Sequence, residues 1–123
     1  MILYILEKIL NKNVSSIEPN PGEKMILQED CSEDNLKNGF LSLTNQRLLF
    51  EKTIGTLATL SKKTGDLLLN ISLDKIDSVY SEGILLKKIV VKLNDNSVYK
   101  FSVFSTKKWV KLIKEQKSLY LQK

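Results

Sequence analysis

The sequence predicts a mainly β protein that ends in an α-helix. Between residues 23 and 104, seven segments show strand-like alternation of apolar and polar residues or lie between turn residues. The last stretch, residues 106–121, instead places its apolar residues at helical spacing. We therefore expect seven antiparallel strands in a barrel or folded sheet, with the helix closing one end.

The chain has 123 residues, so one main domain is expected. We assign residues 1–21 to an N-terminal amphipathic helix and connector, and residues 22–123 to the domain. The helix itself covers residues 1–12 and is too short and too charged to span a bilayer. Three roles stay open for it: packing on the barrel, self-association into a homo-oligomer, and anchoring at a membrane interface.

The stretch NGFLSLTNQRLLFEK, residues 38–52, predicts a hairpin with Asn45 and Gln46 as a two-residue turn. Side chains alternate between the two faces of a strand, so this turn puts four large apolar residues on one face. A slip of one residue would expose all of them, so the register is well specified. The expected core residues of the hairpin are Leu41, Leu43, Leu48 and Phe50.

The other elements follow from the same patterns. Residues 53–66 are either a long loop or an extension of the flanking strands into a longer hairpin. In the last strand pair, a three-residue loop at 95–97 would pair Val91 with Phe101 and place Lys92 opposite Lys100. The strands are expected at residues 23–31, 39–44, 47–52, 67–73, 76–81, 85–94 and 98–104.

The C-terminal helix is expected to begin with Thr106 as its N-cap. Its apolar residues recur at helical spacing, whereas its lysines surround the rest of the helix. The residues expected in its buried stripe are Trp109, Leu112, Ile113, Leu119 and Tyr120.

The net charge of +5 is unevenly distributed. Residues 1–36 hold seven acidic residues and three lysines, a balance of −4, whereas residues 37–123 hold sixteen basic and seven acidic residues, a balance of +9. A basic body favours anionic partners, namely nucleic acid, lipid headgroups or acidic protein surfaces. Arg47 is the only arginine, which makes specific DNA readout less favoured, because such readout depends on bidentate arginine contacts.

The residues of enzyme sites are missing from the sequence. It contains no histidine, the commonest general base and metal ligand, and a single cysteine, Cys31. It has no catalytic triad, no Cys-His pair and no phosphate-binding glycine loop. The acidic residues at 29–34 lack EF-hand spacing and predict a solvated loop. We therefore expect no enzyme activity, cofactor or metal site, and the lone cysteine is compatible with a reducing cytoplasm.

Several stretches resemble the GRAM branch of the pleckstrin-homology-like superfamily over about residues 22–121. They are Gly22-Glu23-Lys24, residues 39–50 (GFLSLTNQRLLF), residues 71–79 (ISLDKIDSV), residues 98–101 and Trp109. The resemblance implies two packed antiparallel sheets of seven strands with a C-terminal helical cap. It also implies binding of phosphoinositides or proteins, without shared chemistry.

Phosphoinositide-binding pleckstrin-homology domains place basic residues in and after the first inter-strand loop. The corresponding loop here is acidic, and Lys37 is its only basic residue. We therefore carry over no binding residues from the family.

A basic face of the sheet is the best candidate site in the sequence. Like charges on opposing strands repel, so Lys92 opposite Lys100 would favour a bound anion, with a solvated face as the alternative. The predicted binding residues are Lys62, Lys63, Lys88, Lys92 and Lys100. We predict a non-catalytic binding module, in the cytoplasm or at its membrane surface, that engages a protein partner or an anionic membrane. The alternative is nucleic-acid binding through phosphate contacts.

Overall fold

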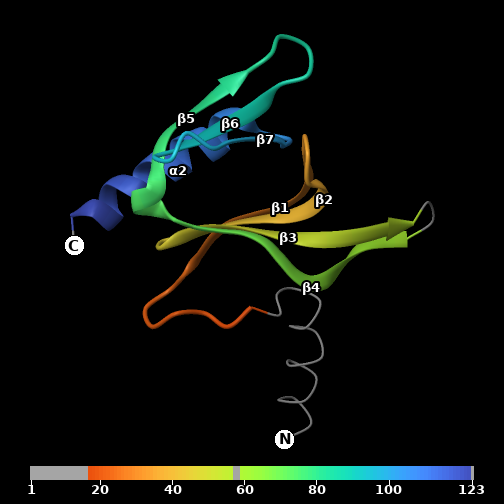
Figure 1. Ribbon diagram of the computed structural model, residues 1–123, viewed down its shortest axis with the longest axis horizontal. Coiled ribbons are helices and arrows are strands. Elements are labelled where there is room, and N and C mark those ends of the chain that lie inside the picture. Colours follow the sequence, from red (N-terminus) through yellow and green to blue (C-terminus); the bar gives the residue numbers. More distant parts are fainter. Residues whose placement is uncertain (1–16, 57–58, 123) are drawn as a thin grey trace, which may run out of the picture.

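The computed structural model describes residues 17–56 and 59–122, with the side chains of residues 55–62 left out of the description. The predicted N-terminal helix, residues 1–12, lies outside the described residues. Seven strands are followed by one long helix, and a 3₁₀ turn, η1, connects β4 to β5 (Figure 1). The elements are β1 Met25–Glu33, β2 Lys37–Thr44, β3 Arg47–Thr56, β4 Thr59–Ser72, η1 Leu73–Lys75, β5 Ile76–Glu82, β6 Lys88–Leu93, β7 Val98–Ser102 and α2 Thr106–Leu121.

All seven strands form one antiparallel sheet in the order β4-β3-β2-β1-β7-β6-β5. The sheet consists of two meanders, β1 to β4 and β5 to β7. They are joined by η1 in the chain and by a short β1–β7 pairing, Ser32 with Ser102 and Glu33 with Phe101. The expected seven strands are confirmed, but the two sheets implied by the resemblance are one continuous curved sheet.

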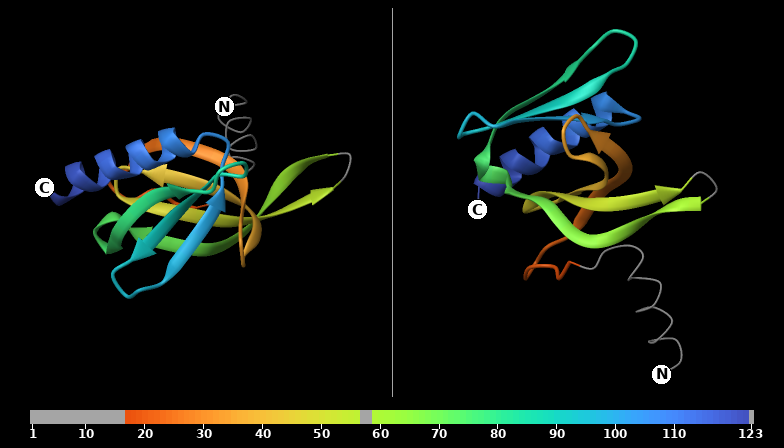
Figure 2. Two further views of the ribbon diagram at one scale, coloured as in Figure 1. Left: turned by 90° about the horizontal axis from the view of Figure 1, so that it is seen from above. Right: turned by 45° about the vertical axis from the view of Figure 1, so that its right-hand side comes forward.

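The core lies between the curved sheet and α2, which crosses the strands (Figure 2). Phe50 and Phe101 meet edge to face at its centre, with ring centroids 5.3 Å apart. They come from different meanders, so this contact holds the two meanders together. The fully buried large side chains include Leu41, Leu43, Leu48, Leu73, Ile76, Ile89, Trp109 and Ile113.

The hairpin of β2 and β3 has the predicted register. Leu43 pairs with Leu48 and Leu41 with Phe50, and all four side chains are buried. Of the two alternatives for residues 53–66, the extended hairpin is the observed one. The strands β3 and β4 continue past the body of the sheet, with several register shifts along their pairing.

The predicted register of β6 and β7 is wrong by two residues. Val91 pairs with Tyr99 instead of Phe101, and Lys92 lies opposite Val98 instead of Lys100. The reason is Asn94, whose backbone N–H donates to the Lys75 carbonyl of η1. This bond takes Asn94 out of the strand pairing, and the turn closes from Leu93 to Ser97, with Asn96 at a φ of 72°.

The strands β6 and β7 are also shorter than predicted. β6 begins at Lys88 instead of residue 85, and β7 ends at Ser102 instead of residue 104. The chain is still turning at Gly83, where φ is 98°. Residues 84–87 therefore form a loop.

The helix α2 spans the predicted residues. Its N-cap is Ser105, which makes no side-chain capping bond, and the predicted cap Thr106 is the first helical residue and is buried. Trp109 and Ile113 are buried as expected, but Leu119 is more than half exposed. Leu112 and Tyr120 are partly buried and pack against the core.

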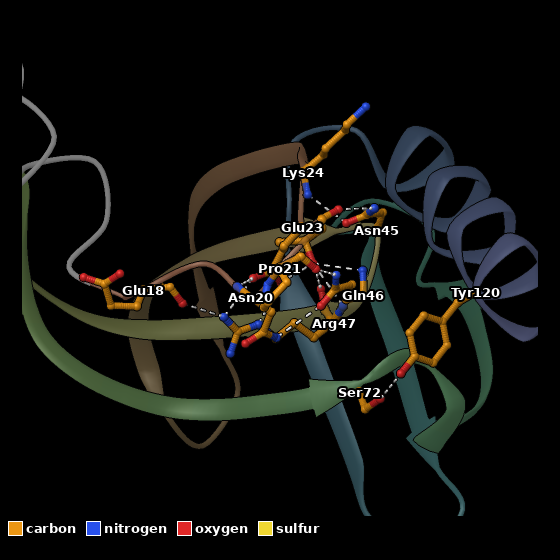
Figure 3. A network of polar contacts seen from close by, with 12 residues as sticks. Glu18, Asn20, Pro21, Glu23, Lys24, Asn45, Gln46, Arg47, Ser72 and Tyr120 are labelled. Carbon is orange, nitrogen blue, oxygen red and sulfur yellow. Dashed lines mark hydrogen bonds and ion pairs between the residues drawn. The ribbon is translucent and has the colours of Figure 1, made fainter. Parts of the chain in front are cut away.

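An ion pair attaches the connector before β1 to the β2–β3 turn (Figure 3). Arg47 Nε and Nη2 donate to the two oxygens of Glu23 at 2.8 and 2.9 Å, and Nη2 also donates to the Glu18 carbonyl at 3.1 Å. Beside them, Asn45 Oδ1 accepts the backbone N–H of Lys24 at 2.8 Å. The only arginine of the chain therefore has a structural role at this turn.

Candidate binding surface

Two of the predicted binding lysines are paired with carboxylates. Lys88 Nζ lies 2.6 Å from Asp34, and Lys100 Nζ lies 2.9 Å from Glu82. The hydrogen bond and charge of Glu82 raise the pKa of Lys100. Both pairs are partly exposed, and each reduces the positive charge offered to a ligand.

The remaining predicted lysines lie apart. Lys63 belongs to β4 and stacks on the Phe40 ring, with Nζ 4.1 Å from the centroid. Burial lowers its pKa, an effect partly offset by the nearby Glu51 carboxylate. Lys92 is half-buried on β6, while Lys62 lies on β4 and its side chain is outside the description. The structure brings Lys88, Lys92 and Lys100 onto adjacent strands and places Lys63 near the other end of the sheet order.

The most exposed apolar residues lie at a different place. The β5–β6 loop carries Ile84, Leu85 and Leu86, which are 90%, 94% and 85% exposed, and Phe104 after β7 is 98% exposed. We call these four residues the tip surface. Large apolar side chains this exposed, and this close together, mark interaction sites in monomeric proteins.

An open hollow of about 760 Å³ connects the two parts of the tip surface. Leu85, Leu86 and Phe104 line it together with Glu29 and Asp30 of β1, and its other lining residues are Lys87, Lys88, Ser102 and Val103. Glu29 fixes this geometry, because one of its oxygens accepts the Phe104 N–H at 2.5 Å and the other accepts Trp109 Nε1 at 2.9 Å. The carboxylate thus attaches Phe104 and the start of α2 to β1.

The β5–β6 loop has a defined shape that depends on Gly83. A Cβ at this position would lie 2.3 Å from the Leu86 carbonyl oxygen, closer than any real contact. Together with its positive φ, this makes glycine necessary here. The turn brings Leu86 back over Gly83 and leaves the three aliphatic side chains outside.

The sequence prediction missed the tip surface because it assigned residues 85–87 to a strand. Three consecutive apolar residues lack the alternation of a half-buried strand, and they follow a glycine and precede Lys87 and Lys88. That combination is the signal that could have identified an exposed loop. Phe104 gave no such signal, because its exposure depends on where β7 ends.

Cys31 has the properties of a structural residue. Burial raises its pKa to about 12, and the Glu29 and Asp30 carboxylates add to the effect. A thiol with such a pKa is not a nucleophile at neutral pH. Within the described residues, no helix is both long and apolar enough to cross a membrane.

Comparison with solved structures identifies the fold. The Vps36 N-terminal PH domain matches with a TM-score of 0.63 and 17% identity, over 86% of this chain and 87% of that domain. This chain has a pleckstrin-homology-like fold. A second match, the C-terminal domain of an unknown protein from Leishmania infantum, has a TM-score of 0.61 and 20% identity over 91% of this chain and 97% of that one. No family model and no curated protein matches the sequence.

In this pleckstrin-homology-like domain, the acidic loop between β1 and β2 is held by internal contacts. Glu33 is buried and accepts the backbone N–H groups of Asn35, Leu36 and Lys100 at 2.8 to 2.9 Å. Asp34 next to it holds Lys88. These carboxylates position the loop and leave the tip surface as the candidate site.

Proposed function

We propose that this chain is a non-catalytic binding module of the GRAM branch that docks on its partner through the tip surface. The pleckstrin-homology-like fold supports a binding role, and the GRAM-like stretch at residues 39–50 supports the finer assignment. The observation that carries the proposal is the near-complete exposure of Ile84, Leu85, Leu86 and Phe104, the last three of which line one hollow.

The magnitude of the hydrophobic effect supports this role for the tip surface. Burying a large aliphatic or aromatic side chain contributes about 1.5–3 kcal/mol. Four such residues would together contribute roughly 6–12 kcal/mol before the costs of association are subtracted. Because Gly83 and Glu29 already fix the backbone on both sides, little ordering is needed on docking.

A photocrosslinker at position 104 tests the proposal. Phe104 would be replaced by a photoreactive phenylalanine in two backgrounds, the natural tip and a variant with Ile84→Ser, Leu85→Ser and Leu86→Ser. In cells that make the protein, we expect adducts to protein or lipid in the natural background and their loss in the serine variant.

The matched control carries the crosslinker at Leu119, which is also exposed but lies on the second half of α2. Adducts from position 119 should be few and should not depend on the tip. Equal adducts from both backgrounds at position 104, or none in either, would contradict the proposal. The serine variant replaces exposed side chains only, so its melting temperature should match that of the natural protein.

A further inference from the structure

We infer that the tip surface docks by inserting Ile84, Leu85 and Leu86 into the surface layer of an anionic lipid bilayer, an inference that rests on the proposed function. The β5–β6 hairpin projects beyond the neighbouring β7, and the β5–β6 loop forms its end (Figures 1 and 2). The three aliphatic side chains of this loop are 85–94% exposed. A projecting apolar loop can be buried in a fluid bilayer, because the lipids rearrange around it.

The composition of the loop favours lipid over a protein pocket. Binding hot spots between proteins are enriched in tryptophan, tyrosine and arginine, and leucine is under-represented among them. The loop offers two leucines and one isoleucine, side chains with no polar atoms to be satisfied in hydrocarbon. Phe104, which is 98% exposed, lines the same hollow as the two leucines and adds an aromatic ring to the apolar surface offered to the layer.

The charges around the loop indicate how it would meet the membrane. Lys87 directly follows the aliphatic residues, is exposed, and has no ion pair within the described part of the chain. Its ammonium group is therefore available to lipid phosphate or carboxylate groups. Lys88, the next residue, forms an ion pair with Asp34 and is the first residue of β6.

The acidic wall of the hollow limits the depth of insertion. Glu29 and Asp30 line the side of the hollow formed by β1, and an anionic surface repels them. Insertion should therefore stop at the depth where Lys87 contacts the headgroups and these carboxylates are still in water. The same carboxylates disfavour the phosphates of a nucleic acid at this surface.

A polarity-sensitive dye on the loop tests insertion directly. The full chain would carry Leu85→Cys labelled with the dye, and a control would carry Leu119→Cys. The natural Cys31 is largely covered and its pKa is raised to about 12, so labelling at neutral pH is selective for the introduced thiol. With vesicles of phosphatidylcholine and about one quarter phosphatidylserine, we expect the emission of the dye at position 85, but not at 119, to shift to the blue.

Co-sedimentation of unlabelled protein with the same vesicles gives the strength of binding. Replacing Leu85 and Leu86 with serine should lower the membrane partition coefficient by at least about tenfold. Lys87→Gln should lower it by about fivefold on anionic vesicles and leave it unchanged on phosphatidylcholine alone. The control variant Leu119→Ser, on exposed α2, should bind as the natural protein does.

The outcomes separate this inference from the proposed function. Vesicle binding that is unaffected by the tip variants, with no change in dye emission, overturns membrane insertion and points to another segment. If the crosslinker at Phe104 then still gives protein adducts that depend on the tip, the docking role holds with a protein partner. Failure of both experiments removes both proposals.

Discussion

The Glu23–Arg47 pair determines how the fold responds to acid. Burial alone would raise the pKa of Glu23, but hydrogen bonds from Arg47, the Asn20 N–H and Thr44 outweigh it and lower the pKa from 4.5 to about 2. A carboxyl group with a lowered pKa stabilises the fold above its unfolded pKa, and this contribution is lost as the pH falls toward the folded value. The affected window is therefore between about pH 4.5 and pH 2.

We expect Glu23→Gln to lower the free energy of unfolding by about 2–3 kcal/mol at pH 7. The natural protein should lose this advantage over the variant between pH 4.5 and pH 2, because its carboxylate becomes protonated there. Urea denaturation of both proteins at several pH values measures the difference between their free energies of unfolding. The contributions of the other carboxylates are the same in both proteins and cancel in this difference. A gap that stays constant down to pH 2 would contradict the prediction.

Cys31 should resist modification as long as the protein is folded. Its pKa of about 12 leaves almost no thiolate at neutral pH, and most of the side chain is covered. A thiol reagent should therefore react many times faster in denaturant than in buffer. The introduced cysteine of Leu85→Cys serves as the positive control, and rapid reaction of folded natural protein would show that Cys31 is accessible.

At the scale of single elements, the β2–β3 hairpin depends on a close approach between a glycine and a ring. A Cβ on Gly39 would lie 2.3 Å from the tip of the Phe50 ring, which is fully buried and in contact with Phe101. The ring has no free space to move into, so a methyl group at position 39 overpacks the core.

Gly39→Ala is therefore expected to destabilise the protein by about 1–3 kcal/mol. The control is Asn38→Ala, which changes the neighbouring exposed position of the same strand. Thermal denaturation of the two variants measures the difference. Equal stability would mean that the Phe50 ring can shift at little cost.

Elements stabilised by local pattern were predictable, and elements that depend on distant partners were not. The register of β2 and β3 follows from the alternation of Leu41, Leu43, Leu48 and Phe50. The register of β6 and β7 depends on a backbone bond from Asn94 to Lys75 of η1, about which the local sequence carries no information. The face of each strand was still right, because a shift of two residues preserves it.

The candidate site was less predictable than the fold. The lysines were chosen because charge is visible in a sequence, but the carboxylates that pair with Lys88 and Lys100 come from β1–β2 and from β5. Apolar runs, in contrast, are normally buried, and Leu85 and Leu86 were assigned to a strand. Only the turn at Gly83 shows that they lie outside.

For the whole molecule, the lysines predicted as a binding site do not form one tract of unpaired charge. Lys88 and Lys100 are paired, and Lys63 stacks on Phe40 on a different part of the sheet. Binding through phosphates needs several unpaired cations along one path.

We therefore expect no retardation of short DNA or RNA duplexes at physiological salt in a gel assay. Any weak binding at low salt should decrease as salt is added. The slope of log K against log salt concentration should be no steeper than about −2, the value for one or two phosphate contacts. A steeper slope would support the nucleic-acid alternative, and Lys62→Glu with Lys63→Glu would then show whether the β3–β4 hairpin carries it.

The short β1–β7 pairing also has a consequence for how the chain folds. Within each meander the strands are neighbours in sequence, so their contacts close small loops, whereas the β1–β7 pairing must close a much longer one. The two meanders should accordingly form first and join last. The single tryptophan, Trp109, donates its ring N–H to Glu29 of β1 from the helix that follows β7. Its fluorescence thus offers a natural probe of the rate-limiting step of folding.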